Sequence, residues 1–550
     1  MQGFAFIQKV FSRKATSVFV TLICIASKSL LIFFYTYTGK DKIYNLSASY
    51  NLLHGKGWTN SFYYVDNVNH EVLQPFCYWP PGYGLLFTPF AAIFKNNVYL
   101  ATSLLEILAF VAFILLCRGI LSTQNISRSW INFSTILLTF TTHEFIDASL
   151  GTDLLALVFL LGFFYCSLRI WNIPGKGIMR WAGIVAGICL FLAGFTRYMY
   201  VPVAIFIAIV MVLMAYWKKN KHALPACFIA AVIGICGLAL SMITQNAACG
   251  SPFYTGIEEQ GVFWNNLTHW HPAAVASFSD LNFLPIQLEK FSGIAFTEWL
   301  RLFNWINWAI YLWIVIAFVR FFLKHINTGA SSFPLFEILG SLLSAAIIGE
   351  LALLSLTNGL KYTVYGETWT FIIEGRYHAF PLVFFQLFLL KKMPGITQLT
   401  RPYHFYKVIF TLCFFLFVLN SLHQLYFTGK TALNFSAMKE NSIREQDYVF
   451  FERLLKKTIH DNPGKEILVA SDDKFYPLLA SMLNSKGLAD IESLNNRLPI
   501  VSKPALLFVI FYHGNESKYT AYLQKNDETQ IKEVAGTRFY MQLLKPGAGN

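Results

Sequence analysis

The chain contains repeated apolar segments of membrane-spanning length, and these restrict it to the folds that a lipid bilayer permits. A helix needs about 20 mostly apolar residues to cross the hydrocarbon core, where every backbone polar group must be satisfied within the structure. Only 13% of the residues are charged, which is too few for an ordinary soluble protein. The sequence therefore predicts a polytopic α-helical membrane protein with about 11 transmembrane helices. The expected spans are 17–37, 98–117, 130–147, 153–171, 182–196, 199–217, 223–243, 304–322, 334–357, 377–391 and 407–426.

Basic residues distinguish the two sides of the predicted membrane. If the N-terminus is cytoplasmic, the inner loops contain 17 Lys and Arg residues and no Asp or Glu. Such an excess in short loops is typical of the cytoplasmic side, so we expect a cytoplasmic N-terminus and an extracytoplasmic C-terminus. The net charge of +13 then reflects membrane topology, and we expect membrane lipids and no nucleic acid as partners. These inner loops are 1–16, 118–130, 169–181, 218–222, 320–333 and 391–407.

The first outer loop, residues 38–80, begins with a carboxylate at the expected bilayer edge. Asp41 follows the first span, and a helix-like run behind it is closed by Gly55 and Gly57. A carboxylate in this position is a candidate catalytic group. The alternative is an ordinary interfacial charge, because lysines flank it on both sides.

The same loop ends in an aromatic, proline-rich turn. Trp79 and Tyr83 enclose the sequence Pro-Pro-Gly, which favours a rigid turn. The apolar piece that follows, residues 81–94, is short for a span, so we expect a helix in the membrane interface. Trp79 and Tyr83 are candidate substrate-binding residues that would cover the carboxylate.

Further charged residues lie at the outer ends of other predicted spans. Asp153 directly precedes an apolar run, where an acid also complements a helix N-terminus and needs no other function. Arg197 and Arg376 oppose the charge rule, and an anionic ligand at this face would explain them. Tyr198 and Tyr377 follow the two arginines directly and are candidates for the same ligand.

Several ionisable residues fall inside predicted spans, where a charge is costly and usually faces a partner or a cavity. They are Lys28, Glu106, Glu337 and Glu350. The simple interpretation is that lysine–glutamate pairs hold helices together. The alternative is an ion or proton path, which would make the chain a transporter.

The composition changes near residue 427, and the C-terminal part reads as a small α/β domain. We therefore divide the chain into a transmembrane domain, 1–426, and an extracytoplasmic domain, 427–550, that is accessory because it carries no catalytic group. Every cysteine except Cys77 lies in or beside an apolar segment, so we expect no structural disulfide. The elements expected in the domain are strands at 465–470, 504–512 and 538–544 and helices at 475–483 and 519–524.

Taken in order, these motifs resemble the GT-C glycosyltransferases. That superfamily includes the dolichyl-phosphate-mannose protein mannosyltransferases and the bacterial aminoarabinose and related polyprenyl-phosphate-sugar transferases. The resemblance covers residues 17 to about 426. Its motifs are Asp41, Trp79-Pro-Pro-Gly-Tyr-Gly-Leu-Leu86, Thr152-Asp153, Gly194-Phe-Thr-Arg197-Tyr198, Asn246-Ala-Ala-Cys-Gly-Ser-Pro-Phe253 and Glu374-Gly-Arg376-Tyr377 with Pro381.

The resemblance implies an enzyme of the bacterial cytoplasmic membrane with a polyprenyl-phosphate sugar as donor and a glycan, lipid or protein as acceptor. It implies that Asp41 accepts the acceptor's proton and that Arg197 and Arg376 bind the lipid phosphate. Asp153 would orient the acceptor or share a cation. Many relatives carry two adjacent acids where this chain has Asp41 followed by Lys42, which leaves a divalent metal ion as an open alternative.

Two functions of different classes thus compete. The first is a membrane glycosyltransferase, and the second is a transporter or flippase of a lipid-linked or ionic substrate, based on the intramembrane charges. Transporters often show paired repeats with broken helices near the midplane, and we find no such repeat in the sequence. A large outer loop and an outer domain also favour an enzyme.

Overall fold

The chain forms two compact units, one of Met1–Ile32 and Glu106–Gly429 and one of Phe33–Leu105 and Lys430–Asn550. We call them the membrane unit and the loop–domain unit and describe each by itself. The computed structural model describes residues 12–34, 40–77, 79–94, 98–141, 151–172, 176–252, 261–269, 283–325, 327, 329, 333–357, 361–364, 367–370, 375–398, 404–433, 443–472, 475–489, 491, 494, 498–512, 531–534 and 537–544.

Helices occupy all of the predicted spans. Counting only the described residues, nine helices are long and apolar enough to cross a membrane. The remaining two predicted spans contain α6 and α16, each with 14 described helical residues. The helices of the predicted spans are α2 (Lys14–Phe34), α5 (Val98–Ser122), α6 (Arg128–Thr141), α8 (Thr152–Asn172), α9 (Lys176–Thr196), α10 (Tyr200–Trp217), α11 (Ala223–Cys249), α14 (Phe296–His325), α15 (Leu335–Thr357), α16 (Ala379–Lys392) and α17 (His404–Leu433).

Smaller elements lie between the later helices, and the sequence analysis did not predict them individually. A short antiparallel hairpin and several brief helices connect α11, α14, α15, α16 and α17. They are η1 (Trp264–His269), α13 (Phe283–Ser292), β3 (Lys361–Val364), β4 (Glu367–Thr370), η4 (Gly375–His378) and η5 (Met393–Gln398).

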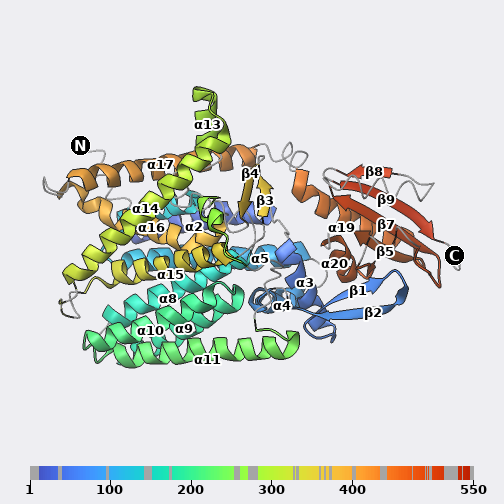
Figure 1. Ribbon diagram of the computed structural model, residues 1–550, viewed down its shortest axis with the longest axis horizontal. Helices are drawn as coiled ribbons and strands as arrows, with labels where there is room; N and C mark the ends of the chain where they lie inside the picture. Colours follow the sequence, from blue (N-terminus) through green and yellow to red (C-terminus); the bar gives the residue numbers. More distant parts are fainter. Residues whose placement is uncertain are drawn as a thin grey trace. The chain divides into compact units, whose positions relative to one another are not determined.

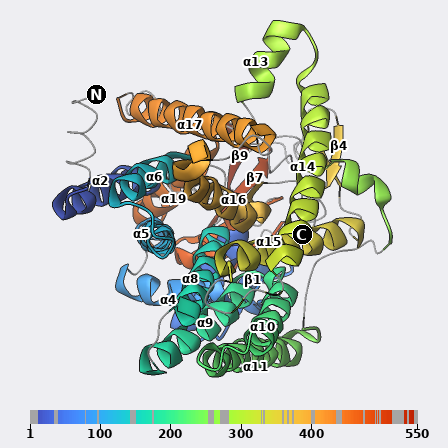
Figure 2. The same cartoon turned by 90° about the vertical axis from the view of Figure 1, so that its left-hand side faces the viewer.

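Small residues bring α9 and α11 close together, and α8 and α10 pack beside them (Figures 1 and 2). A Cβ atom added at Gly183 would lie 2.5 Å from the carbonyl oxygen of Ala226. One added at Gly187 would lie 2.8 Å from the carbonyl oxygen of Ala230. Spacing of small residues by four lets helix backbones approach closely in a membrane, where packing replaces the hydrophobic effect. This contact fixes α9, which ends at Thr196, directly before Arg197.

The loop–domain unit combines the first outer loop with the C-terminal part of the chain. Its five-stranded sheet has the order β6-β5-β7-β9-β8, in which β5 is parallel to β6 and β7, and β9 is antiparallel to β7 and β8. The strands are β5 (Glu466–Ser471), β6 (Lys486–Gly487), β7 (Ala505–Tyr512), β8 (Ile531–Val534) and β9 (Thr537–Leu544). The other elements are α3 (Lys40–Leu53), β1 (Thr59–Tyr64), β2 (Asn67–Pro75), α4 (Gly82–Phe94), α19 (Ile443–Asp461) and α20 (Phe475–Met482).

These elements agree with the predicted strands at 465–470, 504–512 and 538–544 and with the helix at 475–483. The helix predicted at 519–524 lies outside the described residues. Residues 33–105 group with the C-terminal segment in one unit, and the last change between the units falls between Gly429 and Lys430. The predicted domains, 1–426 and 427–550, remain a prediction.

The expectation of no disulfide is wrong, because Cys77 and Cys249 each take part in a disulfide bond. Cys77 lies in the first outer loop, and Cys249 is the last residue of α11, at the helix end that is expected on the outer side. An oxidising environment on that side allows such bonds. The seven other cysteines are free. Apolar surroundings predict the state of these seven, but they do not apply to Cys77 in the outer loop and do not determine the state of Cys249 at the end of α11.

Candidate functional site

Three segments of the membrane unit carry the polar residues of the candidate site. Asp153 lies in the first turn of α8. Arg197 lies in the tight connection between α9 and α10, where the Tyr200 N–H donates a hydrogen bond of 3.0 Å to its carbonyl oxygen. Arg376 and Tyr377 lie in η4, directly before α16. Since α8 packs on both α9 and α16, the packing of these helices brings the three segments close together.

Two guanidinium groups share one carboxylate at this place. An Nη atom of Arg197 forms a salt bridge with Asp153 Oδ1, and Arg376 Nη1 lies 3.8 Å from Asp153 Oδ2. All three side chains are shielded from solvent, with exposed fractions of 1% for Asp153, 6% for Arg197 and 12% for Arg376. A carboxylate at a helix N-terminus needs no such partners, so dipole complementation alone does not account for Asp153. These three groups carry one net positive charge.

The ring of Tyr377 contacts both arginines. Its ring centroid lies 5.0 Å from the guanidinium carbon of Arg197 and 4.9 Å from that of Arg376. An arginine over an aromatic face is attracted by the ring quadrupole, which holds both planar forks in a defined orientation. Arg376 Nη2 also donates a hydrogen bond of 3.3 Å to the Tyr377 hydroxyl. The sequence prediction named all four residues, and the structure brings them together.

Further polar groups surround this cluster. Burial raises the pKa of the Tyr198 hydroxyl to about 12, further above physiological pH than its ordinary value. Tyr200 is fully buried within electrostatic range of Asp153 and Arg197, and among the described residues its hydroxyl has no hydrogen-bond partner. His378 is also fully buried, next to Tyr377. Sequence reasoning missed Tyr200 and His378, although their closeness to Arg197 and Arg376 in the chain could have indicated them.

The cluster suits an anion better than a metal ion. Both oxygens of the Asp153 carboxylate face guanidinium groups, which compete with any cation for them. Over the ranges that the structure describes, no three His, Cys, Asp or Glu residues lie together as metal ligands would. Arginine forks match the planar oxygens of phosphate and carboxylate groups. The arrangement therefore suits an oxyanion as its ligand.

Asp41 lies in the first turn of α3 in the loop–domain unit, and its side chain is outside the described residues. The predicted helix behind it is confirmed, as are its closing glycines, since Gly55 and Gly57 have φ angles of 73° and 72°. Lys42 is fully buried directly beside Asp41. A charged side chain with no exposure at the start of this helix is a feature that the sequence analysis did not recognise.

The aromatic turn leads into α4, which packs closely against α3. Ser49 Oγ donates a hydrogen bond of 2.7 Å to the Gly84 carbonyl oxygen, and a Cβ atom added at Gly84 would lie 2.5 Å from the Trp58 ring. Trp79 is half-buried before α4, whereas Tyr83 is fully buried in the first turn of this helix. Tyr83 thus occupies the position of a core residue, and Trp79 is the more accessible of the two candidates.

One of the intramembrane charges has a structural partner. Glu337 Oε1 lies 2.8 Å from the Nζ atoms of both Lys391 and Lys392. Since α15 begins at Leu335 and α16 ends at Lys392, these pairs join the ends of two helices. The contact supports the interpretation that Glu337 holds helices together.

No protein-family model matches the sequence, and no curated protein matches it either. The solved structures that are similar over almost the whole chain include two of ArnT from Cupriavidus metallidurans. The one bound to undecaprenyl phosphate has a TM-score of 0.52 and 9% sequence identity, and the match covers 96% of this chain and 98% of that one. The apo structure gives a TM-score of 0.51 and 12% identity, with 94% and 97% coverage. The chain therefore shares the overall fold of these two ArnT structures, in agreement with the fold that the resemblance of its sequence motifs implies.

Proposed function

We propose that this chain is an integral membrane glycosyltransferase that moves a sugar from a polyprenyl-phosphate donor to an acceptor on the extracytoplasmic face. The observation that carries the proposal is the buried pair of arginines around Asp153 and Tyr377. A polyprenyl phosphate is an oxyanion whose lipid tail keeps it in the bilayer. The similar ArnT structure that is bound to undecaprenyl phosphate supports this donor class.

In the proposed reaction, an acceptor hydroxyl attacks the anomeric carbon of the sugar. A new bond forms between that carbon and the acceptor oxygen, and the bond to the phosphate oxygen breaks. Asp41 accepts the hydroxyl proton as general base. The phosphate leaves with the electron pair of the broken bond, and Arg197 and Arg376 stabilise the charge that develops on it. Asp153 and Tyr377 hold the two guanidinium groups in place.

Roles in binding extend to the aromatic residues. We propose that the Tyr198 hydroxyl, which stays protonated, donates a hydrogen bond to the polyprenyl-phosphate sugar. Trp79 and Tyr83 are proposed to contact the sugar or the lipid, and Trp79 is the more accessible of the two. The acceptor is a glycan, a lipid or a protein. A divalent cation is not needed in this scheme, because the arginines supply the positive charge.

The direct test of the function is release of polyprenyl phosphate. The purified protein in detergent or nanodiscs is incubated with labelled polyprenyl-phosphate sugars, and the products are separated by thin-layer chromatography and mass spectrometry. We expect turnover of at least one sugar class in the presence of an envelope extract that contains acceptors. Undecaprenyl phosphate should compete with the donor. Failure of every donor to turn over, together with no binding of undecaprenyl phosphate, would contradict the proposal.

The proposed location predicts a cytoplasmic N-terminus and an extracytoplasmic C-terminus. The prediction follows from the inner loops, in which 17 Lys and Arg residues stand against no acid. Fusions at Asn550 to an enzyme that is active only outside the cytoplasm, and to a protein that fluoresces only inside it, would measure this. Activity of the first and silence of the second are expected. The reverse pattern would move the entire proposed site to the other face.

A further inference from the structure

The first outer loop continues the sheet of the C-terminal segment. Leu488, directly after β6, forms a parallel bridge with Tyr63 in β1, and the Ala489 N–H donates a hydrogen bond of 2.8 Å to the Tyr63 carbonyl oxygen. Since β1 pairs with β2, the loop hairpin extends the sheet beyond its β6 edge. An exposed sheet edge offers unpaired backbone groups, and here the loop covers them.

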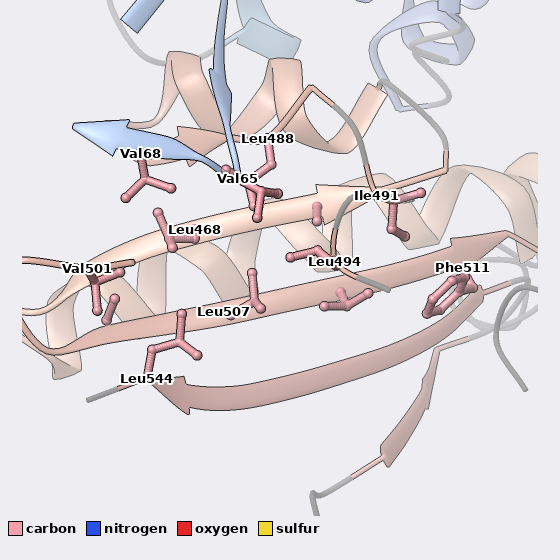
Figure 3. Close-up of a cluster of buried hydrophobic side chains, with 13 residues drawn as sticks. Val65, Val68, Leu468, Leu488, Ile491, Leu494, Val501, Leu507, Phe511 and Leu544 are labelled. Atoms are coloured by element: carbon pink, nitrogen blue, oxygen red, sulfur yellow. The ribbon is translucent and has the colours of Figure 1, made fainter. Parts of the chain in front are cut away.

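The hairpin also contributes side chains to the core of the C-terminal sheet. Val65 and Val68 are 3% and 0% exposed, and they belong to one apolar cluster with residues of β5, β7 and β9 (Figure 3). Figure 3 shows both valines directed from the hairpin toward Leu468. Without the loop this part of the core would be open to water. The other members of the cluster are Leu468, Ala470, Leu488, Ile491, Leu494, Val501, Ala505, Leu507, Val509, Phe511 and Leu544.

Polar side chains also connect the β1–β2 hairpin with the C-terminal segment. Lys486 Nζ lies 3.0 Å from Glu466 Oε2 and 5.6 Å from the centroid of the Tyr63 ring. Ser502 Oγ donates a hydrogen bond of 3.4 Å to Asn69 Oδ1 in the hairpin. The boundary therefore combines backbone pairing, a common core and side-chain contacts, which is typical of one folded unit and not of two modules that touch.

The helix that carries Asp41 is attached to the same structure. One side of α20 packs on β5 and β6, and α20 also packs on α3 and β1 (Figure 1). A Cβ atom at Gly487 in β6 would clash with the Pro477 carbonyl oxygen, so α20 packs directly on the sheet edge at this glycine. Residues 42–49 of α3 are buried except for the half-buried Tyr44, so neighbouring elements enclose the helix on all sides. α20 is one of these neighbours, beside α4 and β1, and it links α3 to the sheet.

We propose that the C-terminal domain is the positioning element of the catalytic loop. The domain holds α3, and with it Asp41, through the α20 contact and the shared sheet. This inference rests on the proposed function, in which Asp41 is the general base. It replaces the expectation, drawn from sequence alone, that the domain is an accessory to a self-sufficient membrane core. Displacement of a catalytic group by about 1 Å costs on the order of a hundredfold in rate.

The test weakens the shared core without touching the candidate site. Val65→Ala and Val68→Ala remove methyl groups that the C-terminal core buries, and Leu73→Ala is the matched control because Leu73 in β2 is 41% exposed. Three properties are measured on the full chain: kcat, donor affinity and hydrogen exchange of the α3 amides. We expect the valine variants to lower kcat by roughly tenfold to a hundredfold. Donor affinity should stay within about twofold, because the proposed phosphate contacts lie in the membrane unit.

A loss of stability alone would lower the fraction of active protein and raise hydrogen exchange throughout the loop–domain unit, but it would leave the kcat–pH profile of the folded protein unchanged. Mispositioning of Asp41 should also move the acid limb of the kcat–pH profile and increase exchange in residues 40–53 while the donor still binds at one site per chain. Val68→Ile, which keeps an apolar side chain in the core, should restore kcat. Leu73→Ala should change none of these properties.

Two results would overturn the inference. In the first, both valine variants leave the exchange of α3 unchanged. In the second, exchange of α3 rises while kcat and its pH profile stay at the wild-type values. Failure of the proposed function would look different, because the wild-type chain would then turn over no donor while the exchange measurement still reports whether the domain holds α3.

Discussion

Asp41→Asn is expected to lower the rate of sugar transfer by about a hundred- to ten-thousand-fold, which is the typical contribution of a general base. Asparagine preserves the size of the side chain and much of its hydrogen bonding, but it cannot accept the acceptor's proton. Donor binding should change little, because the arginines that are proposed to bind the phosphate belong to other segments. Single-turnover transfer from a labelled polyprenyl-phosphate sugar, measured beside donor binding, separates the two effects.

The matched control for this variant is Asp66→Asn. Asp66 is an exposed acid in the same outer loop, at the turn between β1 and β2, and it is not proposed to act in catalysis. Its replacement should leave the rate near the wild-type value. The rate of Asp41→Asn could instead stay within roughly threefold of the wild-type rate, a much smaller loss than removal of a general base causes. Asp41 would then be an interfacial charge and not the base. Asp153 would then be the next candidate.

The membrane helices were predictable because each span is a local property of the chain. Mean hydropathy over about 20 residues decides whether a segment can cross the bilayer, and no distant partner enters that decision. Arg197 and Arg376 could also be predicted from local sequence. They lie at the expected outer ends of spans, whereas basic residues usually lie on the cytoplasmic side. Helix α3 was predicted from its closing glycines.

The pairing of residues far apart in the chain was not predictable. Nothing in the local sequence indicates that Asp153 meets both arginines or that Tyr377 lies between them, because helix packing decides this. The hairpin was also missed. Along β2, Val68 is the only fully buried residue, so the strand lacks the alternation that predicts a sheet with one buried face. Its partners are in the C-terminal segment, and a single sequence gives no sign of them.

Arg376→Lys is expected to weaken donor binding by roughly tenfold to a hundredfold. Lysine retains the positive charge but loses the planar fork and its contact with the Tyr377 ring. Loss of one hydrogen bond to a charged group costs about 1.5–3 kcal/mol. Since about 1.4 kcal/mol corresponds to tenfold in affinity, this gives the expected range. Arg376→Ala removes the charge as well and should weaken binding further.

Arg376 is a better test than Arg197 because of the ion pair that each forms. Arg197 contacts Asp153 directly, so its removal would leave a buried carboxylate poorly paired, which typically destabilises a protein by about 3–5 kcal/mol. Arg376 Nη1 is 3.8 Å from that carboxylate, so its loss disturbs the fold less. For Arg197 we therefore expect weaker donor binding together with a lower melting temperature, and Asp153→Asn in the Arg197→Ala background should recover part of the stability.

The measurement is a titration with undecaprenyl phosphate alone, which requires neither the sugar nor the acceptor to be known. Arg301→Ala is the control, because Arg301 is an exposed arginine at the start of α14 whose partner Glu298 is exposed too. The affinity of Arg301→Ala for undecaprenyl phosphate should equal that of the wild type. This result would exclude a general effect of positive charge near the membrane surface. Unchanged affinity in both Arg376→Lys and Arg376→Ala would remove this residue from the site. The oxyanion would then have to bind elsewhere, because Arg197 alone is largely neutralised by Asp153.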